Sequence, residues 1–134
     1  MESFNHPFGK EACKKRLLEE YRRYGKLIVA FDYDNTIYDY YHKGGNYSEV
    51  INLLKKCAKL GFELVLFTCE EDETCLQNKV DLCEDLLKTG ISLKSSIFSR
   101  SDKPYYNILL DDRAGLEESY EILKYVVDEI IKLN

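Results

Sequence analysis

The stretch that decides the fold is residues 27–36, which read Leu-Ile-Val-Ala-Phe-Asp-Tyr-Asp-Asn-Thr. Its first five residues form a continuous apolar run, which predicts a strand buried on both faces of a parallel sheet. Asp32 and Asp34 follow directly. Residues two apart in an extended chain point to the same side, so we expect both carboxylates to face one site. Two carboxylates this close need a cation or a shared proton to offset their repulsion.

Segments of helical periodicity alternate with short apolar runs on both sides of this stretch. The apolar runs predict strands at 27–31, 63–67, 96–98 and 106–110. The helical segments are 10–24, 46–60, 74–89 (with Gly90 as its cap) and 116–133. Buried strands alternating with helices predict an α/β fold, a three-layer Rossmann-like domain with a parallel sheet of about four strands and helices on both faces.

Polar residues follow each of the three longer strands. Asp32 follows the first, Thr68 the second, and the pair Asp111 and Asp112 the last. Ligands of parallel sheets bind beyond the carboxyl ends of the strands, so these groups are expected at one edge. Several carboxylates without clustered His or Cys favour a hard ion such as Mg²⁺. With Lys103, which precedes the last strand, they would surround a phosphoryl group.

The segment from Asp32 to Thr36 resembles the Asp-x-Asp-x-Thr motif of the haloacid dehalogenase (HAD) superfamily. An apolar strand ending in Thr68, then Lys103, then an acidic pair after an apolar strand, resemble the later motifs of that family and occur in its order. The resemblance covers residues 26–131. The chain looks most similar to small members without a cap domain, of the kind found in phages and bacteria.

The resemblance implies a role for each motif residue. Asp32 would be the nucleophile that forms an aspartyl-phosphate, and Asp34 the general acid and base. Mg²⁺ would be held by the Asp32 carboxylate, the Asp34 main-chain carbonyl and Asp111, with Asp112 supporting its water shell or orienting the lysine. Thr68 and Lys103 would hold the phosphoryl oxygens. The resemblance thus implies catalytic roles for Asp32, Asp34, Thr68 and Lys103, and metal-binding roles for Asp32, Asp34, Asp111 and Asp112.

Three features depart from the family pattern. Asn35 stands where glycine is common, and Asn tolerates a left-handed backbone better than most residues. Lys94 is an alternative to Lys103 as the phosphate-binding lysine. The acidic run from Glu70 to Glu73 follows Thr68 and would repel a multiply charged substrate.

The spacing of the motifs leaves no room for a second folded unit. Residues 37–67, 31 in all, separate Thr36 from Thr68, and 42 residues separate Thr68 from Asp111. Each interval already holds a predicted helix, so we expect no cap domain. The prediction is a single domain over 1–134, with an N-terminal helix at 10–24 and a core at 26–131.

Composition narrows the classes of protein. With 134 residues, 45% apolar, 32% charged and a net charge of -5, the chain has the balance of a globular domain. No apolar run approaches the roughly 20 residues that span a bilayer, so no membrane association is expected. Its five cysteines, an odd number without a Cys-x-x-Cys pair, and the polar first ten residues predict reduced thiols and a cytoplasmic location.

Two functions follow from these patterns. The leading one is a Mg²⁺-dependent phosphomonoester hydrolase whose substrate is a nucleotide, a sugar phosphate or a nucleic-acid end. The alternative is a non-catalytic HAD-like binding module, which the acidic run after Thr68 favours. Tyrosines that cluster after the first motif, including Tyr33 and Tyr38, would form either an aromatic wall for a base or sugar, or a cover for the sheet edge and a homodimer contact.

Overall fold

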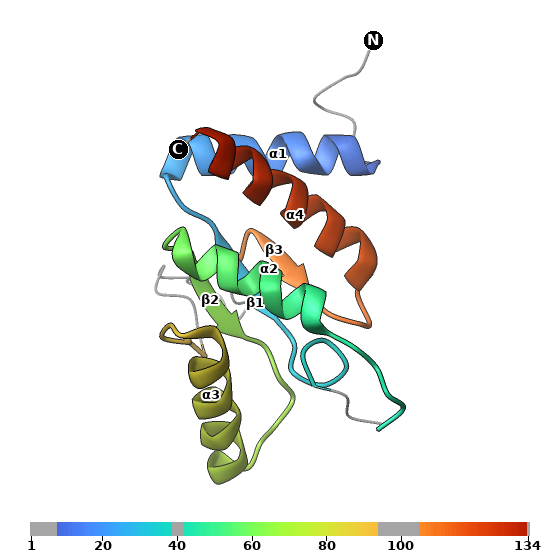
Figure 1. Ribbon diagram of the computed structural model, residues 1–134, viewed down its shortest axis with the longest axis vertical. Helices are drawn as coiled ribbons and strands as arrows, with labels where there is room; N and C mark the ends of the chain where they lie inside the picture. The colour runs from blue at the N-terminus through green and yellow to red at the C-terminus, as the bar shows by residue number, and fades with distance from the viewer. Residues whose placement is uncertain (1–7, 39–41, 94–104, 134) are drawn as a thin grey trace.

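Helices and strands alternate along the chain in a computed structural model, which describes residues 8–38, 42–93 and 105–133 (Figure 1). The elements of the described residues are α1 (Lys10–Tyr24), β1 (Ile28–Phe31), α2 (Ser48–Lys59), β2 (Glu63–Leu66), α3 (Glu73–Leu87), β3 (Ile108–Leu110) and α4 (Leu116–Leu133). The predicted helices at 10–24 and 116–133 are confirmed at both ends. The α/β class is therefore confirmed.

The sheet is parallel, with strand order β2-β1-β3. All four residues of the central strand β1 are buried, as its apolar run predicts. The register pairs Phe31 with Leu66 of β2 and with Leu110 of β3, so the three strands end level with one another. Beyond β2, Ser92 forms a single parallel bridge with Val65. The described sheet thus has three strands rather than about four, and the strand expected at 96–98 lies outside the described residues.

The four helices of the described residues pack on one face of the sheet, where the sequence predicts helices on both faces. All four described helices send buried side chains into the larger core cluster, which contains Val29 and Phe31 of the sheet. The cluster on the other face holds Ile28, Ala30 and Val65, and no helical residue belongs to it. The reason is topological: the chain moves in one direction from β1 through β2 to Ser92, so right-handed crossovers place α2 and α3 on the same side.

The first and last helices pack against each other. Figure 1 shows α4 running across α1 on the side of the molecule away from α3. Leu17 of α1 is completely buried, and the ammonium of Lys10 lies 3.0 Å from a carboxylate oxygen of Glu121 in α4. The N-terminal helix is therefore part of the domain core.

Two further observations bear on the sequence predictions. All five cysteines are free thiols: Cys13, Cys57, Cys69, Cys75 and Cys83. Among the described residues, none of the helices has the length and apolar character that crossing a membrane requires.

Candidate functional site

The level ends of the strands gather the predicted polar residues at one edge of the sheet. The amide of Asp32 donates to the carbonyl of Leu110 (2.9 Å), and the amide of Phe67 donates to the carbonyl of Phe31 (2.8 Å). Each strand is thus hydrogen-bonded to its neighbour up to its last residue. As a result Asp32, Thr68 and Asp111 leave the sheet side by side, as the sequence predicts.

Three carboxylates converge at this edge. Oxygens of Asp32, Asp111 and Asp112 all lie within 4.8 Å of one another. The backbone amide of Arg113 donates to the Asp111 carboxylate (2.9 Å), which fixes the start of the turn after β3. Ligands on opposite sides of an Mg²⁺ ion stand about 4.2 Å apart, since each Mg–O distance is about 2.1 Å. The three residues therefore match a hard divalent cation in donor type.

The convergence of acids changes the titration of Asp32. Burial of its carboxyl group, then the nearby Asp111 carboxylate, and to a smaller extent Asp112 and Asp34, together raise the pKa of Asp32 from 3.8 to about 6. The backbone N–H of Tyr33 opposes this by stabilising the charged form. A cation bound beside Asp32 would stabilise its ionised carboxylate and so lower this pKa.

Asp34 lies in a tight turn after β1, apart from the group of three carboxylates. Asn35 has φ 58°, in the left-handed region, as expected for an Asn that replaces glycine. The amide of Asn35 donates to the carbonyl of Tyr38 (2.6 Å), which closes the turn. Thr36, the last residue of the motif, is completely buried beneath it, so its place is in the packing of the turn.

A cleft of about 970 Å³ opens in front of these residues. Its floor is formed by the ends of the strands, and the loop after β2, together with α3, forms one wall. Its polar lining includes the predicted residues Asp32, Asp34, Thr68, Asp111 and Asp112, together with Glu70, Lys79 and Arg113. The predicted site residues that the structure describes are thus brought together in one cleft.

The side chain of Lys79 brings a positive charge into the cleft, and the sequence did not predict it. Lys79 projects from α3, with its ammonium 3.9 Å from a carboxylate oxygen of Asp34 and 3.4 Å from one of Glu70. Helical periodicity places Lys79 beside the buried Val80, but it does not show that this part of α3 faces the cleft. Lys103 and its alternative Lys94 lie outside the described residues.

The hydroxyl of Thr68 faces the loop that carries the acidic run. Its oxygen accepts a hydrogen bond from the backbone amide of Glu70 (3.3 Å). One carboxylate oxygen of Asp72 accepts from the amide of Cys75 (3.0 Å), so that this acid caps the N-terminus of α3. Part of the acidic run therefore has a structural role in starting the helix.

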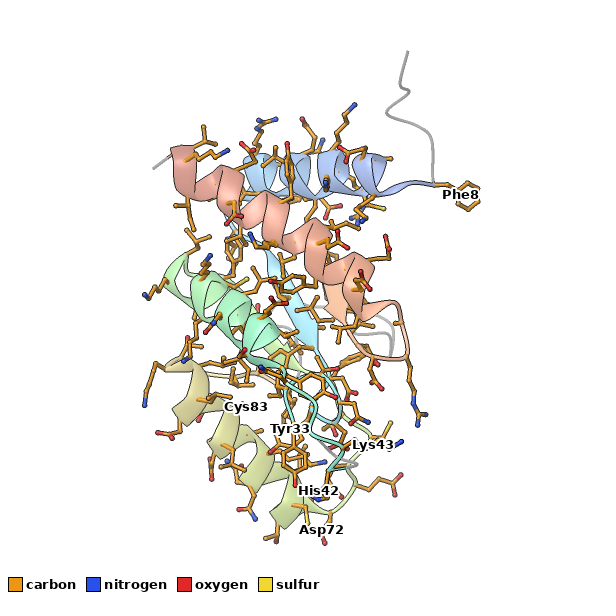
Figure 2. All side chains as sticks on the ribbon, turned by 45° about the vertical axis from the view of Figure 1, so that its right-hand side comes forward. Phe8, Tyr33, His42, Lys43, Asp72 and Cys83 are labelled. Atoms are coloured by element: carbon orange, nitrogen blue, oxygen red, sulfur yellow. The ribbon has the colours of Figure 1, made fainter. Side chains whose placement is uncertain are left out.

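The aromatic residues after the first motif pack on one another. The ring of Tyr33 stacks on Tyr38 with centroids 5.4 Å apart, and His42 meets Tyr38 edge-on at 6.1 Å. In Figure 2, Tyr33 and His42 lie toward the end of the molecule where Asp72 marks the start of α3. Neither tyrosine lines the cleft, so these two rings cover the turn beside it.

Comparison with solved structures supports the fold. The chain is similar to a conserved protein coded by a locus from Bacteroides thetaiotaomicron, with a TM-score of 0.54 and 24% sequence identity. The match covers 75% of this chain and 91% of that chain. At this identity the likeness concerns the fold alone. No protein-family model and no curated protein sequence matches the chain.

Proposed function

We propose that the chain is a Mg²⁺-dependent phosphomonoester hydrolase that works through an aspartyl-phosphate. The observation that carries the proposal is the convergence of Asp32, Asp111 and Asp112, with carboxylate oxygens within 4.8 Å of one another at the floor of the cleft. A cation or a shared proton offsets the charge of such a group, and Mg²⁺ prefers oxygen ligands. Asp32 and Asp111, with the main-chain carbonyl of Asp34, would hold the ion, and Asp112 would support its water shell.

When bound, Mg²⁺ would supply positive charge against the oxygens of the phosphoryl group. A carboxylate oxygen of Asp32 attacks phosphorus, and the ester P–O bond breaks as the new O–P bond forms. Asp34 gives its proton to the departing alkoxide. In the second step Asp34 takes a proton from water, whose oxygen attacks phosphorus, so that phosphate leaves and the Asp32 carboxylate is restored.

Thr68 and a lysine complete the proposed site. The Thr68 hydroxyl lines the cleft and would donate to a phosphoryl oxygen. The lysine expected from the sequence is Lys103 or Lys94, and Lys79 is a further cation already in the cleft. The substrate would be a phosphomonoester such as a nucleotide, a sugar phosphate or a nucleic-acid end.

Turnover of a phosphomonoester panel, measured with and without Mg²⁺, tests the proposal. We expect Asp32→Asn to reduce kcat by at least about 10³-fold, because it removes the attacking oxygen. Asp85→Asn is the matched control, because it is the same substitution at an exposed position of α3. Mg²⁺-dependent binding of fluoroberyllate to Asp32 would provide an independent check on the phosphoryl site.

The alternative proposal is a non-catalytic binding module, which the presence of Glu70 beside Lys79 favours. The absence of turnover for every panel member would overturn the hydrolase in favour of this alternative. Turnover that Asp32→Asn leaves unchanged would rule out the aspartyl-phosphate route through Asp32.

A further inference from the structure

An ion pair between Lys79 and Glu70 occupies one wall of the cleft. The ammonium nitrogen lies 3.4 Å from a carboxylate oxygen of Glu70 and 3.9 Å from one of Asp34. The two side chains of the pair are only 18% and 26% exposed, so water screens their charges less than those of a surface pair. The same ammonium lies 5.3 Å from the ring centroid of Tyr33. Lys79 is thus held inside the cleft.

Glu70 is held in place as firmly as its partner. Its backbone amide donates to the Thr68 hydroxyl (3.3 Å), and its second carboxylate oxygen accepts from the amide of Asp72 (3.3 Å). These bonds tie the side chain to the loop between β2 and α3. If Lys79 turned to another anion, the Glu70 carboxylate would therefore remain at the cleft wall.

The charges of the cleft make Glu70 a competitor of the substrate. The described lining holds five carboxylates, on Asp32, Asp34, Glu70, Asp111 and Asp112, and two cationic side chains, on Lys79 and Arg113. One divalent cation would offset two of the negative charges. An incoming phosphoryl group would have to share Lys79 with Glu70, and any second anionic group would meet an uncompensated carboxylate.

We propose that the Lys79–Glu70 pair sets the charge specificity of the cleft. Lys79 binds a phosphoryl oxygen in competition with Glu70, and the fixed Glu70 carboxylate disfavours substrates with a second anionic group near the ester. The substrate class is then a phosphomonoester whose remaining part is neutral or cationic, in preference to bisphosphates and nucleoside polyphosphates. This inference rests on the proposed hydrolase function.

The kinetic test compares a hexose monophosphate with a hexose bisphosphate. Glu70→Gln should raise kcat/KM for the bisphosphate about 10-fold more than for the monophosphate, which corresponds to removing one charge repulsion in the cleft. Lys79→Met should raise KM for both at least about 10-fold with a smaller effect on kcat, and Lys79→Arg should restore most of the loss. Glu71→Gln, the same change at an exposed neighbour, is the control and should leave the ratio unchanged.

A binding test does not depend on turnover. Calorimetric titration of inorganic phosphate in the presence of Mg²⁺ should show tighter binding to Glu70→Gln and weaker binding to Lys79→Met than to the wild type. If Asp32-dependent turnover occurs but neither variant changes selectivity or phosphate affinity, the specificity proposal is wrong and the hydrolase stands. If no substrate turns over but both variants shift phosphate binding as expected, the hydrolase is wrong and the pair remains an anion selector. If the wild type neither turns over a substrate nor binds phosphate, both are wrong.

Discussion

At the scale of single residues, Asp32 is where the demands of the fold and of the site conflict. The strand that delivers it is buried, and the neighbouring strand delivers two more acids to the same place. Burial and these acids raise the pKa of Asp32 to about 6. The folded protein therefore holds a proton on Asp32 more tightly than the unfolded chain does, and ionising the group weakens folding.

Asp32→Asn should consequently stabilise the metal-free protein at neutral pH. Between pH 3.8 and about 6 the folded state binds more protons than the unfolded state, so wild-type stability falls as pH rises through this window. The variant lacks this loss, and we expect a gain of about 1–2 kcal/mol above pH 6, allowing for solvent screening of a partly buried group. Urea unfolding at pH 4 and pH 7.5 would measure it. A gain of equal size at both pH values would contradict the electrostatic explanation.

Asn35 lies in the turn that directly follows Asp32 and Asp34, and its backbone adopts the left-handed conformation there. At φ 58° alanine is strained, so Asn35→Ala should lower the free energy of unfolding by about 1 kcal/mol, whereas Asn35→Gly should not. Asn78→Ala provides the matched control, because this exposed position lies inside α3, where alanine is favourable. The comparison uses urea midpoints, and an equal loss in both alanine variants would rule out backbone strain as the cause.

The sequence predicts Asp32, Thr68 and Asp111 at one edge because each follows a strand-like apolar run, and parallel strands end together. Lys79 was missed because it lies in the middle of a helix, where its direction depends on how α3 sits beside the sheet. The ion pair with Glu70 likewise joins a loop to that helix, and the spacing of residues does not encode such a contact.

At the scale of elements, the end of α3 and the start of β3 differ from the predicted boundaries. The helix α3 ends at Leu87, and Lys88 adopts the left-handed conformation at φ 56°, so that Gly90 is not the cap. The amide of Lys88 donates to the carbonyl of Glu84, and this bond completes the last turn of α3 two residues before Gly90. The strand predicted at 106–110 begins instead at Ile108. The amide of Ile28 in β1 donates to the side-chain oxygen of Asn107 rather than to a backbone carbonyl of this segment.

Asn107 joins the sheet to α1 through two hydrogen bonds. Its carboxamide oxygen accepts from the buried amide of Ile28 (2.6 Å), and its nitrogen donates to Glu20 of α1 (2.9 Å). Asn107→Ala leaves the Ile28 amide without its side-chain acceptor, and we expect a loss of about 2–3 kcal/mol in the free energy of unfolding. Glu20→Ala removes the outer bond and a surface ion pair with Arg16, and it should cost less than about 1 kcal/mol. Chemical denaturation measures both, and equal losses would place the cost at the α1 contact instead.

At the scale of the whole molecule, a cation bound at the candidate site would link different parts of the chain. Asp32 follows β1, and Asp111 follows β3, so an ion held by both would join two strands. Binding to the folded state alone stabilises it by RT ln(1 + [L]/Kd), about 2.7 kcal/mol at 100 times Kd. Mg²⁺ should therefore raise Tm by several degrees.

Thermal unfolding with Mg²⁺, against NaCl of equal ionic strength, tests this stabilisation. Asp111→Asn should remove the shift, and Asp85→Asn, on the exposed face of α3, should retain it. A shift that is the same in both variants would mean that Mg²⁺ acts elsewhere on the protein.

The packing of α1 on α4 also has a consequence for biosynthesis. Leu17 and Lys10 find their partners in a helix that begins at Leu116, so residues 25–115 must be translated before the first helix can be buried. At 5–20 residues per second, a ribosome needs roughly 5–20 s for that interval. During this time the apolar stripe of α1 is exposed to chaperones, and a chain arrested before α4 cannot bury it. Synthesis of α4 is therefore a condition for burying α1.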